Sequence, residues 1–216
     1  MNTPQTITVK AAEVELEGLL TIPKSATGLV VFVHGSGSSR FSTRNQYVAE
    51  VMNQAGLATL LFDLLTAEEN KIDVTTREYR FDIELLSQRT IATIDWLREQ
   101  PQLQKLSIGL FGASTGAAAA LNAAKERPNE VECVVSRGGR PDLAMPAIPD
   151  VLAPTLLIVG SLDTEVLQLN KLAKQAMQTK CDLVTIDGAT HLFEESGTLE
   201  AAAFAAKEWF IKYLLK

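Results

Sequence analysis

The sequence predicts an α/β fold in which a mostly parallel central sheet carries helices on both faces. Short apolar runs alternate with longer helical stretches along most of the chain. The apolar runs are continuous, which is typical of parallel strands that connecting helices bury on both faces. An alternating segment precedes these runs, and we expect it to form an antiparallel hairpin at the N-terminus.

The strands are predicted from apolar runs of strand length. The N-terminal segment QTITVKAAEVELEGLLTIP alternates with a period of two, as a half-buried hairpin does. Six continuous runs follow it, of which GLVVFVHG and PTLLIVG are representative. These predicted strands span residues 28–35, 56–63, 106–112, 131–139, 154–160 and 181–187.

The helices are predicted in the stretches between these strands. In the longest of them, apolar residues recur at helical spacing until Pro101 ends the pattern. The residues expected on this apolar stripe are Phe81, Leu85, Ile91, Ile94 and Leu97. The predicted helices span residues 43–55, 80–99, 114–127, 164–178 and 198–215.

Length and composition predict one globular domain, residues 1–216. The chain has 46% hydrophobic and 21% charged residues, far from the composition of disordered chains. Its net charge of −6 argues against nonspecific nucleic-acid binding, which needs a basic surface. No apolar run is as long as a membrane span and no secretory signal is recognisable, so we expect a cytoplasmic protein without a membrane partner.

The sequence contains no Cys/His cluster with the spacing of a metal site. Cys133 and Cys181 lie inside apolar, strand-like segments. We therefore expect them to be reduced core residues rather than partners in a disulfide.

The stretch GASTG, residues 112–116, follows a predicted strand and opens a predicted helix. This is the context of a G-x-S-x-G nucleophile elbow, a tight turn that exposes a serine hydroxyl above the sheet. The two glycines leave the room that such a turn requires, and Ser114 stands at its apex. A glycine-rich turn with an incidental serine is the alternative interpretation.

A nucleophilic serine needs a base, and histidine is suited to that role near neutral pH. The chain has two histidines. His34 ends a predicted strand, a place where an imidazole more often supports a loop. His191 lies between the last predicted strand and the last helix, and the chain order serine, acid, histidine selects it.

The acid is expected between Ser114 and His191, at the C-terminal end of a strand. Asp163, in the motif VGSLD, directly follows such a strand. An N-cap for the next helix is the alternative role for this residue. Asp142 and Asp187 are the other candidate acids.

The HGSG loop, residues 34–37, is the candidate for the oxyanion hole. A glycine-rich loop at this place can present a backbone amide to the acyl oxygen, and the amide after the nucleophile supplies a second donor. We therefore assign the backbone N–H groups of Ser36 and Thr115 to the oxyanion hole.

The motifs HGSG, GASTG, VGSLD and GATH occur in this order and span most of the chain. Together they resemble those of α/β-hydrolases, and specifically of the small dienelactone-hydrolase-like branch without a large cap domain. Dienelactone hydrolases proper carry a cysteine at the elbow, where this chain has Ser114. The resemblance implies an α/β-hydrolase fold, a serine esterase mechanism with Asp163 and His191, and no metal or cofactor.

Arginines gather at the edge of the sheet where the elbow is expected. Arg40 and Arg44 follow the HGSG loop, and Arg137 and Arg140 lie at the end of a predicted strand. A guanidinium there can bind a carboxylate or phosphate, which makes Arg40, Arg137 and Arg140 candidate substrate-binding residues. Ion pairs with nearby acidic residues are the alternative, and we give them more weight.

The site is expected to be open to solvent. The connection between the strands at 131–139 and 154–160 is too short for a helical cap domain. Residues 64–81 are polar and long enough to form a partial cover instead.

These observations predict a serine hydrolase that cleaves small carboxylic esters, thioesters or lactones through an acyl-enzyme intermediate. A catalytically silent scaffold that binds a ligand or protein partner is the alternative from another class. Acyl transfer to an acceptor other than water would use the same residues. The sequence does not identify the physiological substrate. It is compatible with a homodimer.

Overall fold

The computed structural model describes residues 3–215 and confirms the predicted fold class. Within these residues, eight strands form one sheet in the order β1-β2-β4-β3-β5-β6-β7-β8. β2 pairs antiparallel with both of its neighbours, whereas the pairs from β4 through β8 are parallel. The strands are β1 (Gln5–Ala11), β2 (Val14–Thr21), β3 (Gly28–Val33), β4 (Ala58–Phe62), β5 (Ser107–Ala113), β6 (Val131–Arg137), β7 (Thr155–Gly160) and β8 (Cys181–Ile186).

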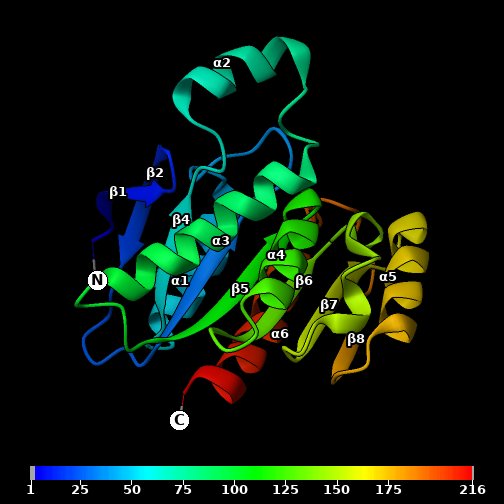
Figure 1. Ribbon diagram of the computed structural model, residues 1–216. Coiled ribbons are helices and arrows are strands. Elements are labelled where there is room, and N and C mark those ends of the chain that lie inside the picture. Colours follow the sequence, from blue (N-terminus) through cyan, green and yellow to red (C-terminus); the bar gives the residue numbers. More distant parts are fainter. Residues whose placement is uncertain (1–2, 216) are drawn as a thin grey trace.

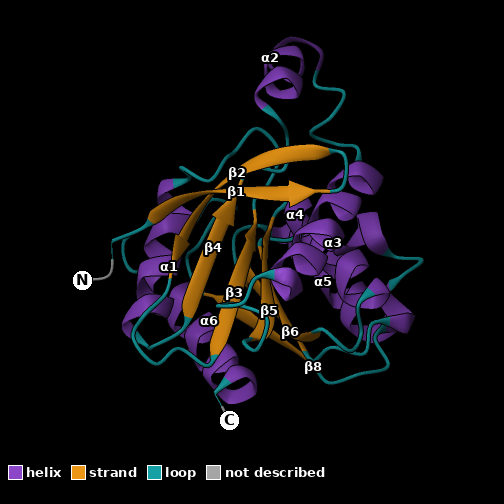
Figure 2. Cartoon of the chain, turned by 60° about the vertical axis from the view of Figure 1, so that its left-hand side comes forward, coloured by secondary structure: helices purple, strands orange, loops and turns teal. Residues whose placement is uncertain are grey.

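Helices bury both faces of the sheet (Figure 1). α1 (Thr43–Gln54) and α6 (Thr198–Leu214) pack on one face. The helices on the other face are α3 (Ile83–Glu99), α4 (Thr115–Glu126) and α5 (Thr164–Ala176). Figure 2 shows the sheet between these two layers, with the β1-β2 hairpin crossing its upper end.

The continuous apolar runs of the sequence form the buried centre of the sheet. β3, β4 and β7 are buried along their whole length, as expected of strands covered on both faces. β1 and β2 lie at one edge and keep the alternation of a half-exposed hairpin. In the centre, Phe32 and Phe111 are register partners on adjacent strands, with ring centroids 4.9 Å apart.

One helix was not predicted from the sequence: α2 (Ala67–Thr76), which rises above the edge of the sheet (Figure 1). It lies inside the segment expected to form a polar cover. The Thr66 side chain accepts from the Glu69 amide, and the Glu69 carboxylate accepts from the Thr66 amide. This reciprocal capping box starts a helix whose apolar content alone would not mark it.

Phe81 was placed wrongly on the apolar stripe of the long helix. The Asp82 side chain accepts from the Leu85 amide, so α3 begins at Ile83 and excludes Phe81. Phe81 is 57% exposed, whereas Ile94 and Leu97 on the same predicted stripe are fully buried.

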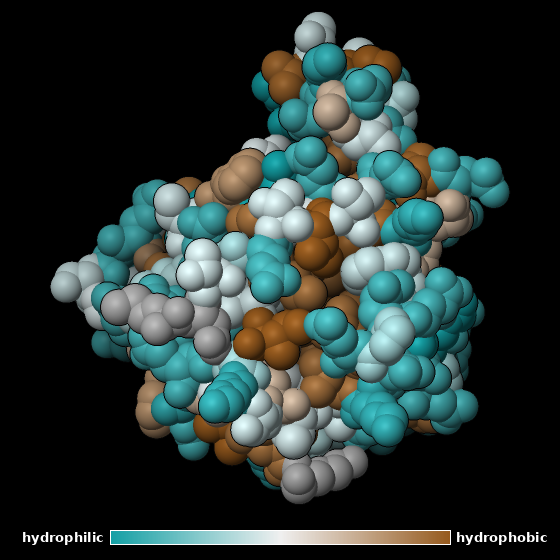
Figure 3. Space-filling view, turned by 90° about the vertical axis from the view of Figure 1, so that its left-hand side faces the viewer, coloured by the Kyte–Doolittle hydropathy of each residue, from teal (hydrophilic) through white to brown (hydrophobic). Residues whose placement is uncertain are grey.

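The face that carries the hairpin shows apolar side chains in a band between more polar flanks, with the α2 segment standing above it (Figure 3). Among residues 3–215, no helix combines the length and the apolar character that crossing a bilayer requires. Both cysteines are free thiols, with Cys133 buried and Cys181 half-buried. Burial raises the pKa of the Cys181 thiol to about 11, which keeps it protonated at neutral pH.

Candidate active site

Ser114 stands at a strained turn between β5 and α4. Its backbone has φ 51° and ψ −122°, a conformation that residues with a side chain rarely adopt. The flanking residues must be glycines because neighbouring backbone atoms approach them closely. A Cβ at Gly112 would lie 2.4 Å from the Ala117 Cα, and one at Gly116 would lie 2.2 Å from the Val33 carbonyl oxygen.

Asp163 and His191 face each other across the ends of β7 and β8. His191 Nδ1 lies 2.6 Å from Asp163 Oδ2. Asp163 occupies the N-cap position of α5, yet its side chain makes no capping hydrogen bond. The carboxylate therefore serves the imidazole rather than the helix, and the geometry disfavours the N-cap interpretation.

The end of β6 lies between the serine and the histidine. The Ser114 amide donates to the Arg137 carbonyl at 3.2 Å. The next residue, Gly138, has positive φ and lies against the imidazole, because a Cβ there would be 3.6 Å from His191 Cε1. One strand end thus contacts both Ser114 and His191.

The loop that carries His191 is held by hydrogen bonds between its own residues. The Glu195 carboxylate accepts from both the amide and the hydroxyl of Thr190. These hydrogen bonds lower the pKa of Glu195. Phe193, also at positive φ, is 2% exposed and anchors the loop to the core. The imidazole therefore sits on a short loop that is held on both sides.

His34 supports the HGSG loop, as expected. Its Nδ1 donates to the Gly35 carbonyl at 2.9 Å, and its Nε2 accepts from the Leu64 amide at 3.1 Å. This pattern fixes a neutral tautomer. Burial lowers the pKa of His34 below its ordinary value, so the ring stays neutral.

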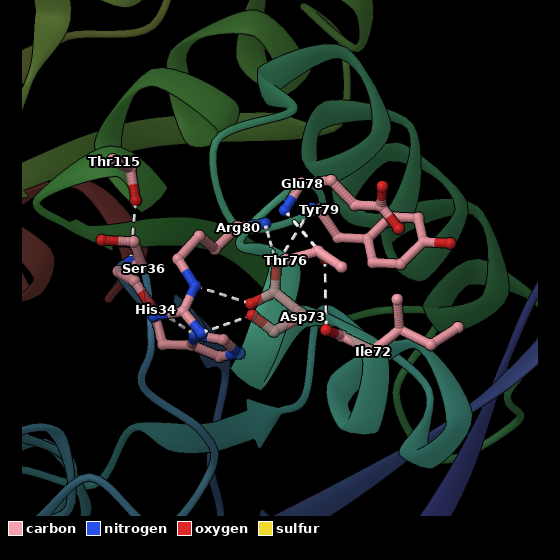
Figure 4. A network of polar contacts seen from close by, with 10 residues as sticks. His34, Ser36, Ile72, Asp73, Thr76, Glu78, Tyr79, Arg80 and Thr115 are labelled. Carbon is pink, nitrogen blue, oxygen red and sulfur yellow. Dashed lines mark hydrogen bonds and ion pairs between the residues drawn. The ribbon is translucent and has the colours of Figure 1, made fainter.

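Ser36 and Thr115 are brought together by a direct hydrogen bond. The Ser36 amide donates to Thr115 Oγ1 at 2.9 Å, although the residues are 79 positions apart in the chain (Figure 4). The loop and the start of α4 are therefore in contact, and the Ser36 amide that was assigned to the oxyanion hole donates to the Thr115 hydroxyl.

A cavity of about 300 Å³ opens beside the HGSG loop and beneath the α2 segment. Ser36 and Gly37 line one side of it, and Asp73 and Arg80 line the other. Asp73 is 1% exposed and accepts from the Tyr79 and Arg80 amides and from Arg80 Nε (Figure 4). The Arg80 guanidinium thereby extends toward Gly37.

Asp73 and Arg80 were not predicted from the sequence to line a cavity beside the HGSG loop. The only signal was that both fall in the segment expected to cover it. Burial acts to raise the pKa of Asp73, but the hydrogen bonds from Arg80 and Tyr79 prevail and lower it. The pair holds the cover in a defined position.

Three of the four arginines noted in the sequence form ion pairs. Arg40 pairs with Glu17 and Asp63. Arg140 pairs with Asp142 at 2.7 Å, and Arg44 lies 3.6 Å from Glu194. For these three arginines, an ion pair within the protein compensates the guanidinium charge.

Arg137 differs from these three because it is buried and forms no ion pair with a carboxylate among residues 3–215. It is 8% exposed, and its Nη2 donates to Asn45 Oδ1 at 3.3 Å. Its Nε and Nη1 are buried and have no hydrogen-bond partner among the described residues. The rings of Phe111 and Phe193 lie 5.9 and 5.7 Å from the guanidinium carbon.

The other candidate acids make different contacts. Asp142 pairs with Arg140, and Asp187 accepts from Ser161 Oγ at 3.5 Å. Asp163 is the candidate acid that contacts His191. Within residues 3–215, no group of three or more His, Cys, Asp or Glu side chains is placed to hold a metal ion.

This fold is that of an α/β-hydrolase. The model of the dienelactone hydrolase family matches residues 16–214, so the chain belongs to the dienelactone hydrolase family. A crystal structure described as dienelactone hydrolase from Anabaena variabilis ATCC 29413 is 58% identical to this chain. The match covers 98% of this chain and 99% of the crystallised chain, with a TM-score of 0.96.

The fold is shared with more distant esterases. An esterase from Pyrococcus furiosus has a TM-score of 0.80 at 17% identity, covering 99% of this chain and 94% of its own. At that identity, the likeness concerns the fold alone. The sequence-based resemblance to small α/β-hydrolases without a large cap is thus confirmed.

Two curated relatives from Mycobacterium tuberculosis, strains CDC 1551 and H37Rv, are 55% identical over 208 residues. The alignment covers 96% of this chain but 46% of each relative, so the chain spans about half of their length. Their names propose a phosphoribosyl transferase, a description that concerns those longer proteins.

Proposed function

We propose that this member of the dienelactone hydrolase family is a serine hydrolase acting on small carboxylic esters, thioesters or lactones. The observation that carries the proposal is the 2.6 Å contact between His191 Nδ1 and Asp163 Oδ2, on the rim that also holds the strained Ser114. An acid that orients a histidine base for a nearby serine is the arrangement that activates a hydroxyl.

In the first half of the reaction, His191 Nε2 takes the proton of Ser114 Oγ as that oxygen attacks the carbonyl carbon. The Asp163 carboxylate accepts from Nδ1–H and stabilises the imidazolium that forms. The carbonyl π electrons move onto the oxygen, which the backbone amide of Thr115 stabilises. Collapse expels the alcohol or thiol, which receives the proton from His191.

In the second half, water attacks the acyl-enzyme while His191 accepts one of its protons. The second tetrahedral species collapses, the bond to Ser114 Oγ breaks, and that oxygen regains its proton from His191. The products are a carboxylic acid and a free enzyme. In a lactone, the same steps open the ring and leave acid and alcohol on one molecule.

The size of the neighbouring cavity and the short connection between β6 and β7 support small substrates. The cavity beside the HGSG loop, which Ser36 lines but Ser114 and His191 do not, measures about 300 Å³, at the lower end of the range for small-molecule sites. The segment between β6 and β7 holds only two short 3₁₀ turns, Pro141–Ala144 and Ile148–Asp150. This connection carries no cap domain, and α2 borders only the cavity beside the HGSG loop.

Turnover of short-chain aryl esters, thioesters and small lactones tests this function. We expect the wild type to hydrolyse at least one class, and Ser114→Ala to lose that activity at an unchanged melting temperature. Ser196→Ala, which removes an exposed serine near the His191 loop, is the matched control and keeps full activity. A folded wild type without turnover on the whole panel would favour a silent scaffold, and turnover only with an added alcohol would indicate acyl transfer.

A further inference from the structure

The side chain of Thr115 engages the amide that was assigned to the oxyanion hole. Thr115 directly follows Ser114, begins α4 and is 4% exposed. Its Oγ1 accepts the hydrogen bond of the Ser36 amide at 2.9 Å (Figure 4). The two candidate oxyanion residues are therefore linked through a hydroxyl group.

Thr115 offers two donors on one residue. Its amide is one of the first of α4, which a helix leaves without an intrahelical acceptor. Its hydroxyl accepts from Ser36 through a lone pair and keeps its own proton for another acceptor. The amide nitrogen and Oγ1 are three bonds apart, so a single oxygen atom can accept from both.

We propose that the Thr115 hydroxyl is a catalytic group that donates a hydrogen bond to the acyl oxygen, supported from behind by the Ser36 amide. This inference rests on the proposed serine-hydrolase function and deepens it. Donation by Ser36 polarises the Thr115 O–H bond, because hydrogen bonds in a chain strengthen one another. The bond to the acyl oxygen strengthens as that oxygen becomes negative, and no proton is transferred.

Close packing holds the hydroxyl at this place. A Cβ at Gly116 would lie 2.2 Å from the Val33 carbonyl oxygen, so the start of α4 is pressed against the end of β3. A Cβ at Gly35 would lie 3.0 Å from the Ser114 Cβ, so the HGSG loop abuts the elbow. Loop and elbow therefore cannot separate freely, and Thr115 Oγ1 stays within reach of Ser36.

The competing interpretation is that the hydroxyl blocks the oxyanion hole. In that case Thr115 must rotate away before the Ser36 amide can reach the substrate. The two accounts predict opposite effects when the hydroxyl is removed. Loss of a donor slows the chemical step, whereas loss of a block leaves it unchanged or accelerates it.

Steady-state kinetics of Thr115→Val and Thr115→Ser decide between them. Valine keeps the branched shape without the hydroxyl, and we expect kcat to fall on the order of 10²-fold while KM stays within about threefold. Serine keeps the hydroxyl, so we expect kcat within about threefold of the wild type. This split, with rescue by serine, is not expected if Thr115 only packs.

A Thr115→Val protein with kcat equal to or above the wild type would overturn the inference while leaving the hydrolase function intact. Circular dichroism and melting temperature establish that each variant folds, and Thr115→Ala replaces valine if the latter does not. A wild type that neither turns over esters nor reacts at Ser114 would overturn the proposed function and this inference with it. The two failures are therefore distinguishable.

Discussion

At the scale of the residue, Ser114 is held by its backbone. The Ser114 amide donates to the Arg137 carbonyl, and the Ser114 carbonyl accepts from the Arg140 amide. A residue in such a sparsely populated conformation costs about 1–3 kcal/mol and persists only where its surroundings fix it. The end of β6 and the residues that follow it supply these constraints, which leaves the Ser114 side chain available for chemistry.

Arg137 is the residue whose burial is least compensated. Burial lowers the pKa of its guanidinium to about 10, and the charge of Arg44 adds to this effect. A buried charge without a carboxylate is normally costly, since desolvation is not repaid by an ion pair. Arg137 therefore either lowers the stability of the folded protein or binds an anionic group.

We expect Arg137→Met to raise the free energy of unfolding by about 1 kcal/mol, because an apolar side chain of similar length removes the desolvation cost. Urea unfolding measures this change. Arg127→Met is the matched control, because it breaks the exposed pair with Asp95 and is expected to lower stability slightly. A loss of stability in Arg137→Met would show that the guanidinium is satisfied in the folded protein.

The same variant tests the substrate-binding role. If Arg137 binds an anionic group, its removal raises KM for a negatively charged ester and leaves KM for a neutral ester unchanged. Equal KM changes for both esters would exclude that role.

At the scale of the element, α2 is a locally stabilised cover. Its capping box at Thr66 and Glu69 and the Glu69–Arg89 ion pair to α3 hold its start. The Asp73–Arg80 pair holds its end. No apolar stripe of α2 is buried in the core, and its stability therefore depends on these polar contacts.

We expect Thr66→Ala to destabilise α2 by about 1 kcal/mol through loss of the capping hydrogen bond. Amide hydrogen exchange should rise within residues 67–76 while the main unfolding midpoint stays the same. Thr76→Ala at the other end of α2, where the hydroxyl bonds to the Ile72 carbonyl, serves as control. A fall in the global midpoint without a local exchange change would show that α2 unfolds together with the sheet.

The elements with strong apolar patterns were predictable from the sequence, and polar ones were not. The continuous apolar runs predicted the ends of β3 through β8 to within about two residues. Burial on both faces of the sheet requires such an apolar composition. α2 has no such pattern, although T-x-x-E at residues 66–69 was a readable helix start.

The candidate site was predictable where it depends on chain order and strand ends. Ser114, Asp163 and His191 each follow a strand, so their approximate place results from the topology. The Asp73–Arg80 and Ser36–Thr115 contacts were not predictable, because side-chain partners brought together by tertiary folding leave no local pattern. Burial of Arg137 without an acid even contradicts the expectation for charged residues.

At the scale of the whole molecule, sheet order explains why distant residues meet. β3, β5, β6, β7 and β8 are neighbours in the sheet and parallel. The HGSG loop, Ser114, Arg137, Asp163 and His191 lie at or after the C-terminal ends of these five strands. This is the edge at which open α/β sheets bind their ligands.

The buried, neutral His34 makes stability depend on pH. Its folded pKa is lowered, so below about pH 6.5 the unfolded chain takes up a proton that the folded protein does not. The free energy of unfolding should therefore fall as pH decreases below this value, by at most about 1.4 kcal/mol per pH unit from this residue. Urea unfolding of wild type and His34→Gln at pH 7.5 and 5.5 measures this pH dependence. The other titrating groups contribute to both proteins, so their contributions cancel when the two are compared. A larger acid loss in His34→Gln than in the wild type would contradict a neutral His34.

The central claim is that Ser114 is an activated nucleophile served by His191. Intact-mass analysis after treatment with a small fluorophosphonate tests it most directly, on wild type, Ser114→Ala and His191→Ala. We expect one phosphonate on the wild type, mapped to Ser114, and none on either variant. A folded wild type that stays unlabelled, or a label on a residue other than Ser114, would contradict it.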